Sequence, residues 1–269
     1  MKRLSRLEKR YRGLHYETGQ LPAPLIDQSA FWQLPHATRR FVYQVLVPSS
    51  RTHLRRVRYA LPENINAPTL KPFLDTRSVF VHIPKAAGIS ISFSLYGRKT
   101  GDHRTMADYA LALSRQELKE SFKFTFVRNP WDRVLSTYFY LKQGGRNKQD
   151  KRWAQENLSR FDSFEDFVKR WLTKEKANSE LHFKPQYKFL CISNSEPCVD
   201  YIGYLENLKQ AYNEIRSTLG IGKELAKINT ARDGYEYNYR DYYTHESKEI
   251  VRETCHEDIA ILGYKFDST

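Results

Sequence analysis

The chain has 269 residues, a length that fits one large domain or two small ones. Its 44 Lys and Arg residues outnumber 31 Asp and Glu residues, which gives a formal net charge of +13. Three cysteines are too few for a disulfide framework, although a single pair between Cys191 and Cys198 stays open. The cysteines and the scattered histidines lack the paired spacing of a zinc site, so we expect no metal.

The positive charge is concentrated at the start of the chain. Residues 1–60 contain 12 Lys or Arg residues and three acidic residues, a net charge of +9. Seven prolines interrupt residues 1–75 and leave room only for short helices near 29–46. We therefore expect a basic N-terminal extension over 1–75 and the main domain over 76–269. The basic segment predicts an anionic partner, either a membrane surface or an acidic glycan, and a solvated basic face is the alternative.

Apolar runs are short throughout the chain. The best of them, residues 41–47, is seven residues long and includes a glutamine, which is too short for a signal peptide or a membrane span. We therefore expect a soluble protein in the cytoplasm, at the inner face of a membrane if the basic segment binds lipid. The sequence contains no RNP motif, zinc finger or helix-turn-helix signature, so we expect no nucleic-acid partner.

Strand and helix patterns alternate after residue 76. Residues 77–82 and 122–127 are rich in β-branched and aromatic residues, which predicts two short strands, each followed by a helix, over 89–96 and from Asn129-Pro130 to about residue 142. A third strand is predicted over 199–204. Further helices are expected over 161–173, 207–219 and 246–262. This alternation predicts an α/β fold with a mainly parallel sheet flanked by helices.

The first candidate site is the loop after the first strand, with the sequence Pro84-Lys85-Ala86-Ala87-Gly88-Ile89-Ser90. A strand that leads through small residues into a helix directs backbone N–H groups at an anion, and the helix dipole favours negative charge. Lys85 adds a positive charge and Ser90 a hydroxyl donor. The G-x-x-x-x-G-K-[ST] pattern is absent, which disfavours a kinase or another NTPase. An ordinary turn with a surface lysine explains the loop alone equally well.

The second candidate site follows the second strand. Arg128 lies at the carboxyl end of that strand, where α/β folds bind ligands, and Ser136 lies about two turns into the next helix. An arginine and a serine at this separation can bind one phosphate group. A local ion pair explains Asp132 and Arg133 equally well, so we expect a structural role for both. Arg232, in a glycine-containing loop, is a further candidate for the same ligand, although simple exposure to solvent also explains it.

Together these segments resemble the Golgi-type carbohydrate sulfotransferases. Residues 82–90 are similar to their loop for the 5′-phosphosulfate of 3′-phosphoadenosine 5′-phosphosulfate (PAPS), and residues 127–138 to their 3′-phosphate segment. Segments within 182–206 and 239–266 are similar to the chondroitin and dermatan 4-O-sulfotransferase branch. The resemblance spans about residues 77–267 and implies a P-loop-like fold. The chain departs from it at Ala87 and Ile89, where the family often has threonine.

The resemblance implies an enzyme that transfers a sulfuryl group from PAPS to a hydroxyl of a carbohydrate, such as a cell-surface or capsular polysaccharide, without a metal. A soluble, bacterial-type member of the family is expected. A small-molecule or lipid acceptor, and a non-catalytic module that binds acidic glycans, remain alternatives. The residues expected to bind the donor are Pro84, Lys85, Ala86, Ala87, Gly88, Ile89, Ser90, Arg128, Ser136 and Arg232.

Three side chains are expected to act in catalysis. Lys85 is predicted to stabilise the leaving-group oxygen. A histidine is the usual base near neutral pH, and two are candidates. His103 lies between the two nucleotide segments, where several sulfotransferase branches have a base, and His182 begins the His-x-x-Pro-Gln segment that the chondroitin-type members also show. His103 is slightly preferred, and a structural, hydrogen-bonded histidine is the alternative for each.

Overall fold

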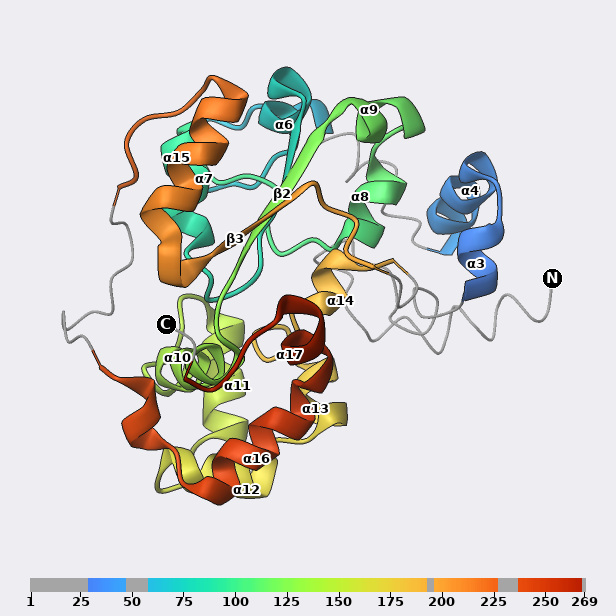
Figure 1. The fold of residues 1–269 in the computed structure, drawn as a ribbon. Coiled ribbons are helices and arrows are strands. Elements are labelled where there is room, and N and C mark those ends of the chain that lie inside the picture. Colours follow the sequence, from blue (N-terminus) through green and yellow to red (C-terminus); the bar gives the residue numbers. More distant parts are fainter. Residues whose placement is uncertain (1–28, 47–57, 193–195, 227–236, 268–269) are drawn as a thin grey trace, which may run out of the picture.

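The computed structural model describes residues 29–46, 58–192, 196–226 and 237–267 (Figure 1). Its elements in chain order are α3 (Ser29–Gln33), α4 (His36–Leu46), α6 (Lys71–Thr76), β1 (Ser78–Val81), α7 (Gly88–Tyr96), α8 (Met106–Ala112), α9 (Arg115–Glu120), β2 (Phe122–Val127), α10 (Pro130–Lys142), α11 (Lys148–Asn157), α12 (Phe164–Trp171), α13 (Lys174–Ser179), α14 (Tyr187–Leu190), β3 (Tyr201–Tyr204), α15 (Leu208–Leu219), α16 (His245–Thr254) and α17 (His256–Leu262), with 3₁₀ turns at Leu205–Asn207 and Tyr239–Tyr242.

The three described strands form one parallel sheet in the order β1-β2-β3. Ser78 pairs with Phe122 and Phe124 with Tyr201, so all three carboxyl ends lie at the same edge. Parallel strands are covered by helices on both faces, and most residues of these strands are accordingly apolar. Helices α7 and α15 lie on one side of this sheet, and α8 and α14 lie on the other (Figure 1). The predicted α/β class is confirmed, as are the three strands.

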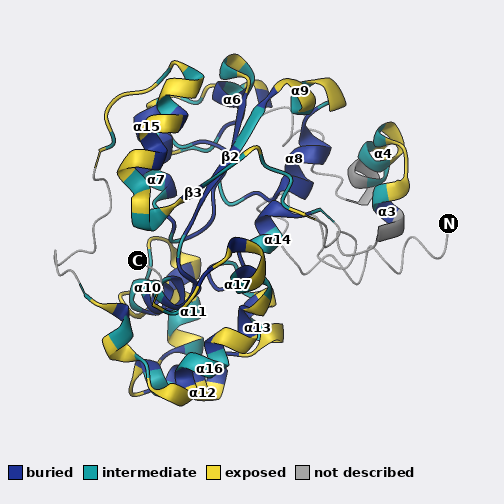
Figure 2. Ribbon diagram, in the orientation of Figure 1, coloured by how far each residue is buried: buried dark blue, intermediate teal, exposed yellow. Residues whose placement is uncertain are grey.

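A second, helical layer lies beyond the carboxyl ends of the strands. Helices α10, α11, α12, α13, α16 and α17 gather there (Figure 1). Their buried faces form a core of their own, which includes Trp131, Leu135, Phe167, Trp171 and Phe183 and is separate from the core around the sheet. Dark blue inner faces and yellow outer faces show this division in Figure 2. The site described below lies where these two layers meet.

Helix α10 begins as its sequence predicts. The Oδ1 atom of Asn129 accepts a hydrogen bond of 3.1 Å from the backbone N–H of Trp131, and Pro130 occupies the first turn. The helix ends before Gly144 and Gly145, which both have positive φ. Because the cap fixes where α10 starts, it also fixes which of its residues face the carboxyl ends of the strands.

The predicted closing helix over 246–262 is wrong in one respect. The structure has two helices there, because Cys255 leaves the helical conformation with φ −107° and ψ 24°. The break allows Asp258 to accept hydrogen bonds of 2.8 Å from the backbone N–H groups of Gln186 and Tyr187. It therefore ties the end of the chain to the segment that begins at His182.

Part of the expected N-terminal extension packs against the main body. Phe31, Leu70 and Phe73 belong to the core around the sheet, and the guanidinium of Arg58 donates a hydrogen bond of 2.6 Å to the carbonyl of Ala112. The boundary at residue 75 stays a prediction, since these contacts cross it. Within the ranges given above, no helix has both the length and the hydrophobicity to cross a membrane. All three cysteines, including Cys191 and Cys198, are free thiols.

Candidate functional site

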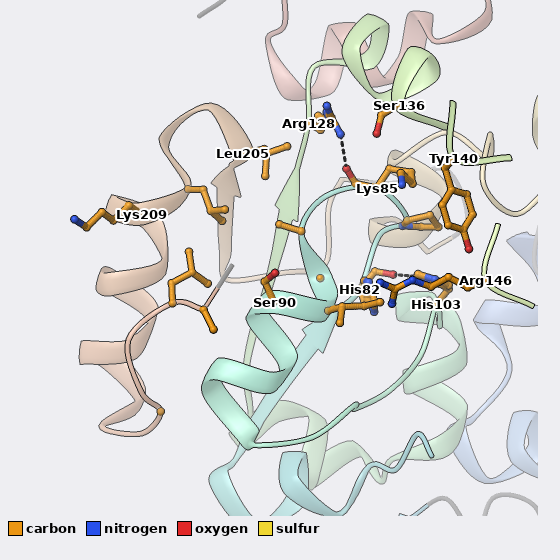
Figure 3. A pocket seen from close by; sticks show the side chains of 18 of the residues that line it. His82, Lys85, Ser90, His103, Arg128, Ser136, Tyr140, Arg146, Leu205 and Lys209 are labelled. Carbon is orange, nitrogen blue, oxygen red and sulfur yellow. Dashed lines mark hydrogen bonds between the residues drawn. The ribbon is translucent and has the colours of Figure 1, made fainter. Parts of the chain in front are cut away.

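A cavity of about 1560 Å³ opens where the three strands end. The residue that follows each strand lines it: His82 after β1, Arg128 after β2 and Leu205 after β3 (Figure 3). This is the edge at which α/β sheets bind ligands. Pockets for a single drug-sized ligand reach about 1,000 Å³, so this cavity has room for two reactants.

The loop from Pro84 to Ser90 forms the floor of the cavity. Lys85 and Ala87 both adopt left-handed conformations, with φ of 67° and 58°. Such conformations cost non-glycine residues about 1–3 kcal/mol each and are concentrated at functional sites. The N-cap residue of α7 is Ala87, whose methyl group cannot accept a hydrogen bond, and the N-terminus of this helix lies at the cavity floor.

Gly88 is the residue that lets this loop approach the strand. A Cβ atom at this position would lie 1.8 Å from Cδ2 of His82, whose ring is buried beneath the loop. No side chain of any size fits there without moving the imidazole. The glycine of the predicted motif is therefore explained by close packing.

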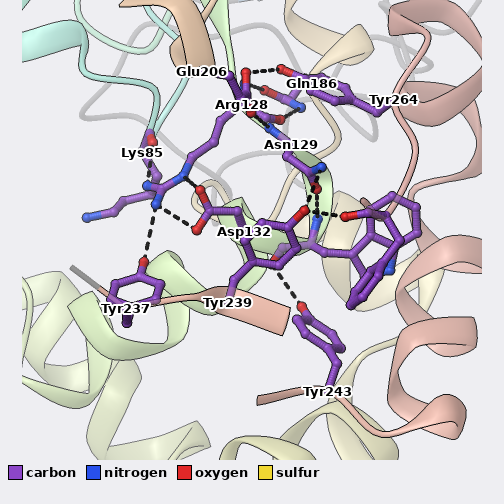
Figure 4. Close-up of polar contacts among 12 residues, drawn as sticks. Lys85, Arg128, Asn129, Asp132, Gln186, Glu206, Tyr237, Tyr239, Tyr243 and Tyr264 are labelled. Carbon is purple, nitrogen blue, oxygen red and sulfur yellow. Dashed lines mark hydrogen bonds and ion pairs between the residues drawn. The ribbon is translucent and has the colours of Figure 1, made fainter. Parts of the chain in front are cut away.

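Arg128 lies on the wall beside the loop, in a network of polar contacts (Figure 4). Its guanidinium makes two hydrogen bonds with the carboxylate of Asp132, of 2.7 and 2.8 Å. It also donates to the carbonyl of Lys85 at 3.1 Å and to the hydroxyl of Tyr237 at 3.2 Å. Although burial lowers the pKa of Arg128, the adjacent carboxylate of Asp132 raises it, and the net shift is upward. Ser136 lines the cavity near Arg128 (Figure 3).

The predicted ion pair between Asp132 and Arg133 is wrong. Asp132 pairs with Arg128, and Arg133, which is 1% exposed, projects from α10 in a different direction. The guanidinium of Arg133 donates to the carbonyls of three consecutive residues, 182–184, at 3.1, 3.3 and 2.8 Å. Adjacent residues of a helix point in different directions, so sequence proximity did not decide this pairing.

His103 lines the cavity and is partly exposed. Its Nδ1 atom lies 3.0 Å from the carbonyl oxygen of His82. A carbonyl only accepts, so Nδ1 carries the proton and the lone pair of the neutral ring is on Nε2. Burial lowers the pKa of His103 to about 4, although the neighbouring Asp102 opposes this shift. At neutral pH the ring is therefore unprotonated and able to accept a proton.

His182 also lines the cavity, in a different environment. Its Nε2 atom lies 3.1 Å from Oδ1 of Asp150, and its Nδ1 atom is buried. The ring centroids of His182 and His103 are 6.1 Å apart. The structure thus places both candidate bases at one cavity. His103 is the more accessible of the two, and His182 is buried in the cavity wall, where it is hydrogen-bonded to the carboxylate of Asp150.

The structure brings together the predicted donor-binding residues with two exceptions. Pro84, Lys85, Ala87, Gly88, Ile89, Ser90, Arg128 and Ser136 all line the cavity. Ala86 points into the core around the sheet and is 1% exposed. Arg232 lies outside the residues that the structure describes.

Sequence reasoning missed several residues of the cavity wall. Tyr140 and Arg146 come from α10 and the turn after it, and Tyr237 comes from the segment before the last helices. Lys209 and Arg216 lie on α15, four residues before and three residues after the cavity residue Asn213. This spacing defines one face of a helix and is readable in the sequence. No sequence pattern indicates that Tyr140, Arg146 or Tyr237 lines the cavity.

The described part of the cavity wall is strongly positive. Lys85, Arg128, Arg146, Lys209 and Arg216 line it, against one acidic residue, Glu224. Such a cavity attracts a ligand with several negative charges. No cluster of three or more possible metal ligands occurs within the described ranges.

Comparison with known proteins agrees with this geometry. Residues 78–264 match the model of the family described as "Sulfotransferase family". The chain belongs to the sulfotransferase family. The matched range includes all three strands and every described residue of the cavity, from His82 to Tyr237. The loop after β1 and the arginine after β2 are therefore parts of a sulfotransferase domain.

Two relatives are similar to parts of this sulfotransferase. An uncharacterized protein of Archaeoglobus fulgidus is 38% identical over 119 residues, which are 44% of this chain and 81% of that protein. Carbohydrate sulfotransferase 14 of Mus musculus is 28% identical over 133 residues, which are 42% of this chain and 34% of that protein. The match thus spans about a third of the mouse protein. No solved structure gives a significant match.

Proposed function

We propose that this sulfotransferase uses PAPS as its donor and a carbohydrate hydroxyl as its acceptor. The observation that carries the proposal is that the loop at Lys85 and the pair Arg128–Ser136 line one positive cavity. PAPS carries a 5′-phosphosulfate and a separate 3′-phosphate. Each of these two parts of the cavity wall offers groups that can bind an anion. The mouse relative is named a carbohydrate sulfotransferase, which supports a sugar as the acceptor.

In the proposed complex, each end of the donor has its own partners. The phosphosulfate lies at the N-terminus of α7, where backbone N–H groups and Lys85 neutralise its charge. The 3′-phosphate lies against Arg128 and Ser136. Arg128 keeps its bonds to Asp132 in this arrangement, because that carboxylate orients the guanidinium toward the cavity.

The reaction is an in-line transfer. The acceptor oxygen forms a new bond to sulfur as the bond from sulfur to the bridging oxygen of the donor breaks. The electron pair of that bond stays on the 5′-phosphate of the product, 3′-phosphoadenosine 5′-phosphate (PAP), next to Lys85. The proton of the acceptor hydroxyl passes to Nε2 of His103, the more accessible base. His182 is the alternative base.

Calorimetry with PAP tests the donor site. Binding with one site per chain is expected, together with a rise in the unfolding temperature that follows PAP concentration. Absence of any binding contradicts the proposal and favours a non-catalytic module for acidic glycans. ATP turnover with magnesium, and none with PAPS, would likewise contradict it.

The acceptor is tested with PAPS that carries labelled sulfate. Label is expected in oligo- or polysaccharide and not in lipid or phenolic compounds. Labelling of lipid or phenol alone would assign a different acceptor class. The chondroitin and dermatan branch, and an anionic partner for residues 1–60, stay predictions from the sequence.

A further inference from the structure

The ammonium group of Lys85 lies over an aromatic ring. Its Nζ atom is 4.1 Å from the ring centroid of Tyr140, on the far side of the loop from Ser90 (Figure 3). A cation within about 6 Å of an aromatic face is attracted to it, and the attraction is stronger where water is excluded. The lysine side chain is half-buried, so the ring limits where its flexible end can lie.

Tyr140 is itself held in place. Its hydroxyl donates a hydrogen bond of 2.5 Å to Oδ2 of Asp150. Its ring also lies 5.2 Å, centroid to centroid, from the ring of His182. These two contacts hold the plane of the ring next to the ammonium of Lys85.

Asp150 is the point at which these contacts meet. One carboxylate accepts from the hydroxyl of Tyr140, from the backbone N–H of Arg146 at 3.1 Å and from Nε2 of His182 at 3.1 Å. It is 7% exposed, and these bonds hold its pKa far below the ordinary value despite burial. Gly145 leaves the room that it needs, because a Cβ there would lie 2.7 Å from Oδ2 of Asp150.

We propose that Tyr140 and Asp150 are positioning residues of the transfer site: the ring of Tyr140 fixes the ammonium of Lys85, and the carboxylate of Asp150 fixes that ring together with His182. Asp150 does not line the cavity and acts only through its partners. The proposal rests on the function proposed above, since Lys85 must lie at the leaving oxygen for its position to matter. A displacement of about 1 Å in such a group can cost two orders of magnitude in rate.

The charges around Lys85 give the proposal a second consequence. Burial, Arg128 and Arg146 lower the pKa of Lys85 to about 8, and Asp150 opposes them. Other titratable residues of the described cavity wall are His82, His103, His182, Lys209, Arg216, Glu224 and Tyr237. The ring of Tyr140 and the carboxylate of Asp150 both favour the ammonium form, so loss of either lowers the pKa of Lys85 further.

The experiment uses the full chain and three variants. Tyr140→Leu removes the ring, Tyr140→Phe keeps the ring and removes the bond to Asp150, and Asp150→Asn removes the negative charge. Tyr201→Phe is the matched control, because the hydroxyl of Tyr201 donates to Glu214 at the same distance of 2.5 Å outside the cavity. Thermal unfolding identifies any variant that fails to fold. If Asp150→Asn is such a variant, the two Tyr140 variants alone test the proposal.

Two readouts are needed. The first is the NMR signal of ¹³C-methylated Lys85, assigned by its loss in Lys85→Arg. In the unmodified sequence and in Tyr140→Phe we expect an upfield ring-current shift of this signal, which disappears in Tyr140→Leu. The pH titration of the signal is expected to move to lower pH in Tyr140→Leu and in Asp150→Asn.

The second readout is the conversion of PAPS to PAP, with water or added saccharide as the acceptor. We expect kcat to fall about tenfold or more in Tyr140→Leu and about threefold in Tyr140→Phe, with PAP affinity changed less than about threefold.

The outcomes separate this proposal from the function on which it rests. If Tyr140→Leu retains the shifted lysine signal, or retains kcat within about twofold, the positioning role is wrong while PAP binding stands. If PAP does not bind to the unmodified protein, the proposed function fails and the positioning role fails with it. Equal losses in the control Tyr201→Phe would also overturn the proposal.

Discussion

The imidazole of His82 occupies the space into which any side chain at position 88 would project. The distance from a Cβ at Gly88 to Cδ2 of the ring would be 1.8 Å, which is far inside van der Waals contact. The ring has little room to move away. Its centroid lies 5.6 Å from that of Phe80, on which it stacks, and 4.3 Å from that of His103. The shape of the loop over the strand therefore depends on these two residues together.

Gly88→Ala is expected to weaken PAP binding by about a hundredfold, because the loop must lift from the strand to relieve the clash. The double variant His82→Ala/Gly88→Ala removes the ring and keeps the backbone carbonyl that orients His103. We expect it to regain part of the affinity. Calorimetric titration of PAP measures both. A double variant that binds no better than Gly88→Ala alone would show that the clash is not the cause.

Arg128→Lys is expected to weaken PAP binding by about 10- to 100-fold, or about 1.5–3 kcal/mol. A lysine cannot make the two parallel bonds to Asp132 and still reach the cavity. Arg170→Lys is the matched control, because Arg170 pairs with Asp166 at the same spacing on the exposed face of helix α12. That pair is expected to contribute less than about 0.5 kcal/mol to stability and nothing to PAP affinity. Equal PAP affinity in both variants would remove Arg128 from the donor site.

The pH dependence of kcat/KM for PAPS is expected to reflect two groups of the free enzyme. Lys85 must be protonated, so activity falls as the pH rises through about 8, and His103 must be neutral, so activity falls as the pH drops through about 4. Bound donor adds negative charge beside Lys85 and raises its pKa, so the alkaline limb of kcat lies at higher pH than that of kcat/KM. An unchanged kcat/KM from pH 7 to 10 would contradict a role for Lys85.

Lys85→Arg provides the control for this profile. An arginine stays protonated at all accessible pH values, so the alkaline limb is expected to disappear, at a reduced maximal rate. If the limb persists in this variant, it belongs to another group. A steady-state assay of PAP release across the pH range makes the measurement.

Arg133→Met is expected to destabilise the fold by about 3 kcal/mol or more, because the carbonyls at 182–184 lose the three hydrogen bonds that the buried guanidinium donates. The carbonyl of His182 keeps a second donor, the hydroxyl of Thr137. Arg152→Met is the control on a surface helix, where Arg152 is 75% exposed and lies 3.9 Å from Glu156. Its effect is expected to stay within about 0.5 kcal/mol. Denaturant unfolding measures both, and a cost below about 1 kcal/mol for Arg133→Met would show that the 182–184 segment does not depend on it.

The main elements of the sheet could be predicted because their signals are local. Strands β1 and β2 are short segments rich in β-branched and aromatic residues, and Asn129 and Pro130 indicate the start of α10. Helix α8 was missed because it is buried on all sides and has no polar face to reveal its period. The short helix α9 was also missed, although the capping box of Ser114 and Glu117 is visible in the sequence.

The sequence by itself determined the parallel α/β arrangement, the two segments that line the cavity and the family to which they belong, because each depends on residues within one strand–loop–helix unit. Only the tertiary structure decided that Asp132 pairs with Arg128, that Asp150 joins Tyr140 to His182, and that Lys85 lies over a tyrosine ring. These contacts join side chains whose directions depend on how the helical layer packs against the sheet. Packing of this kind is a property of the whole chain, and no local pattern encodes it.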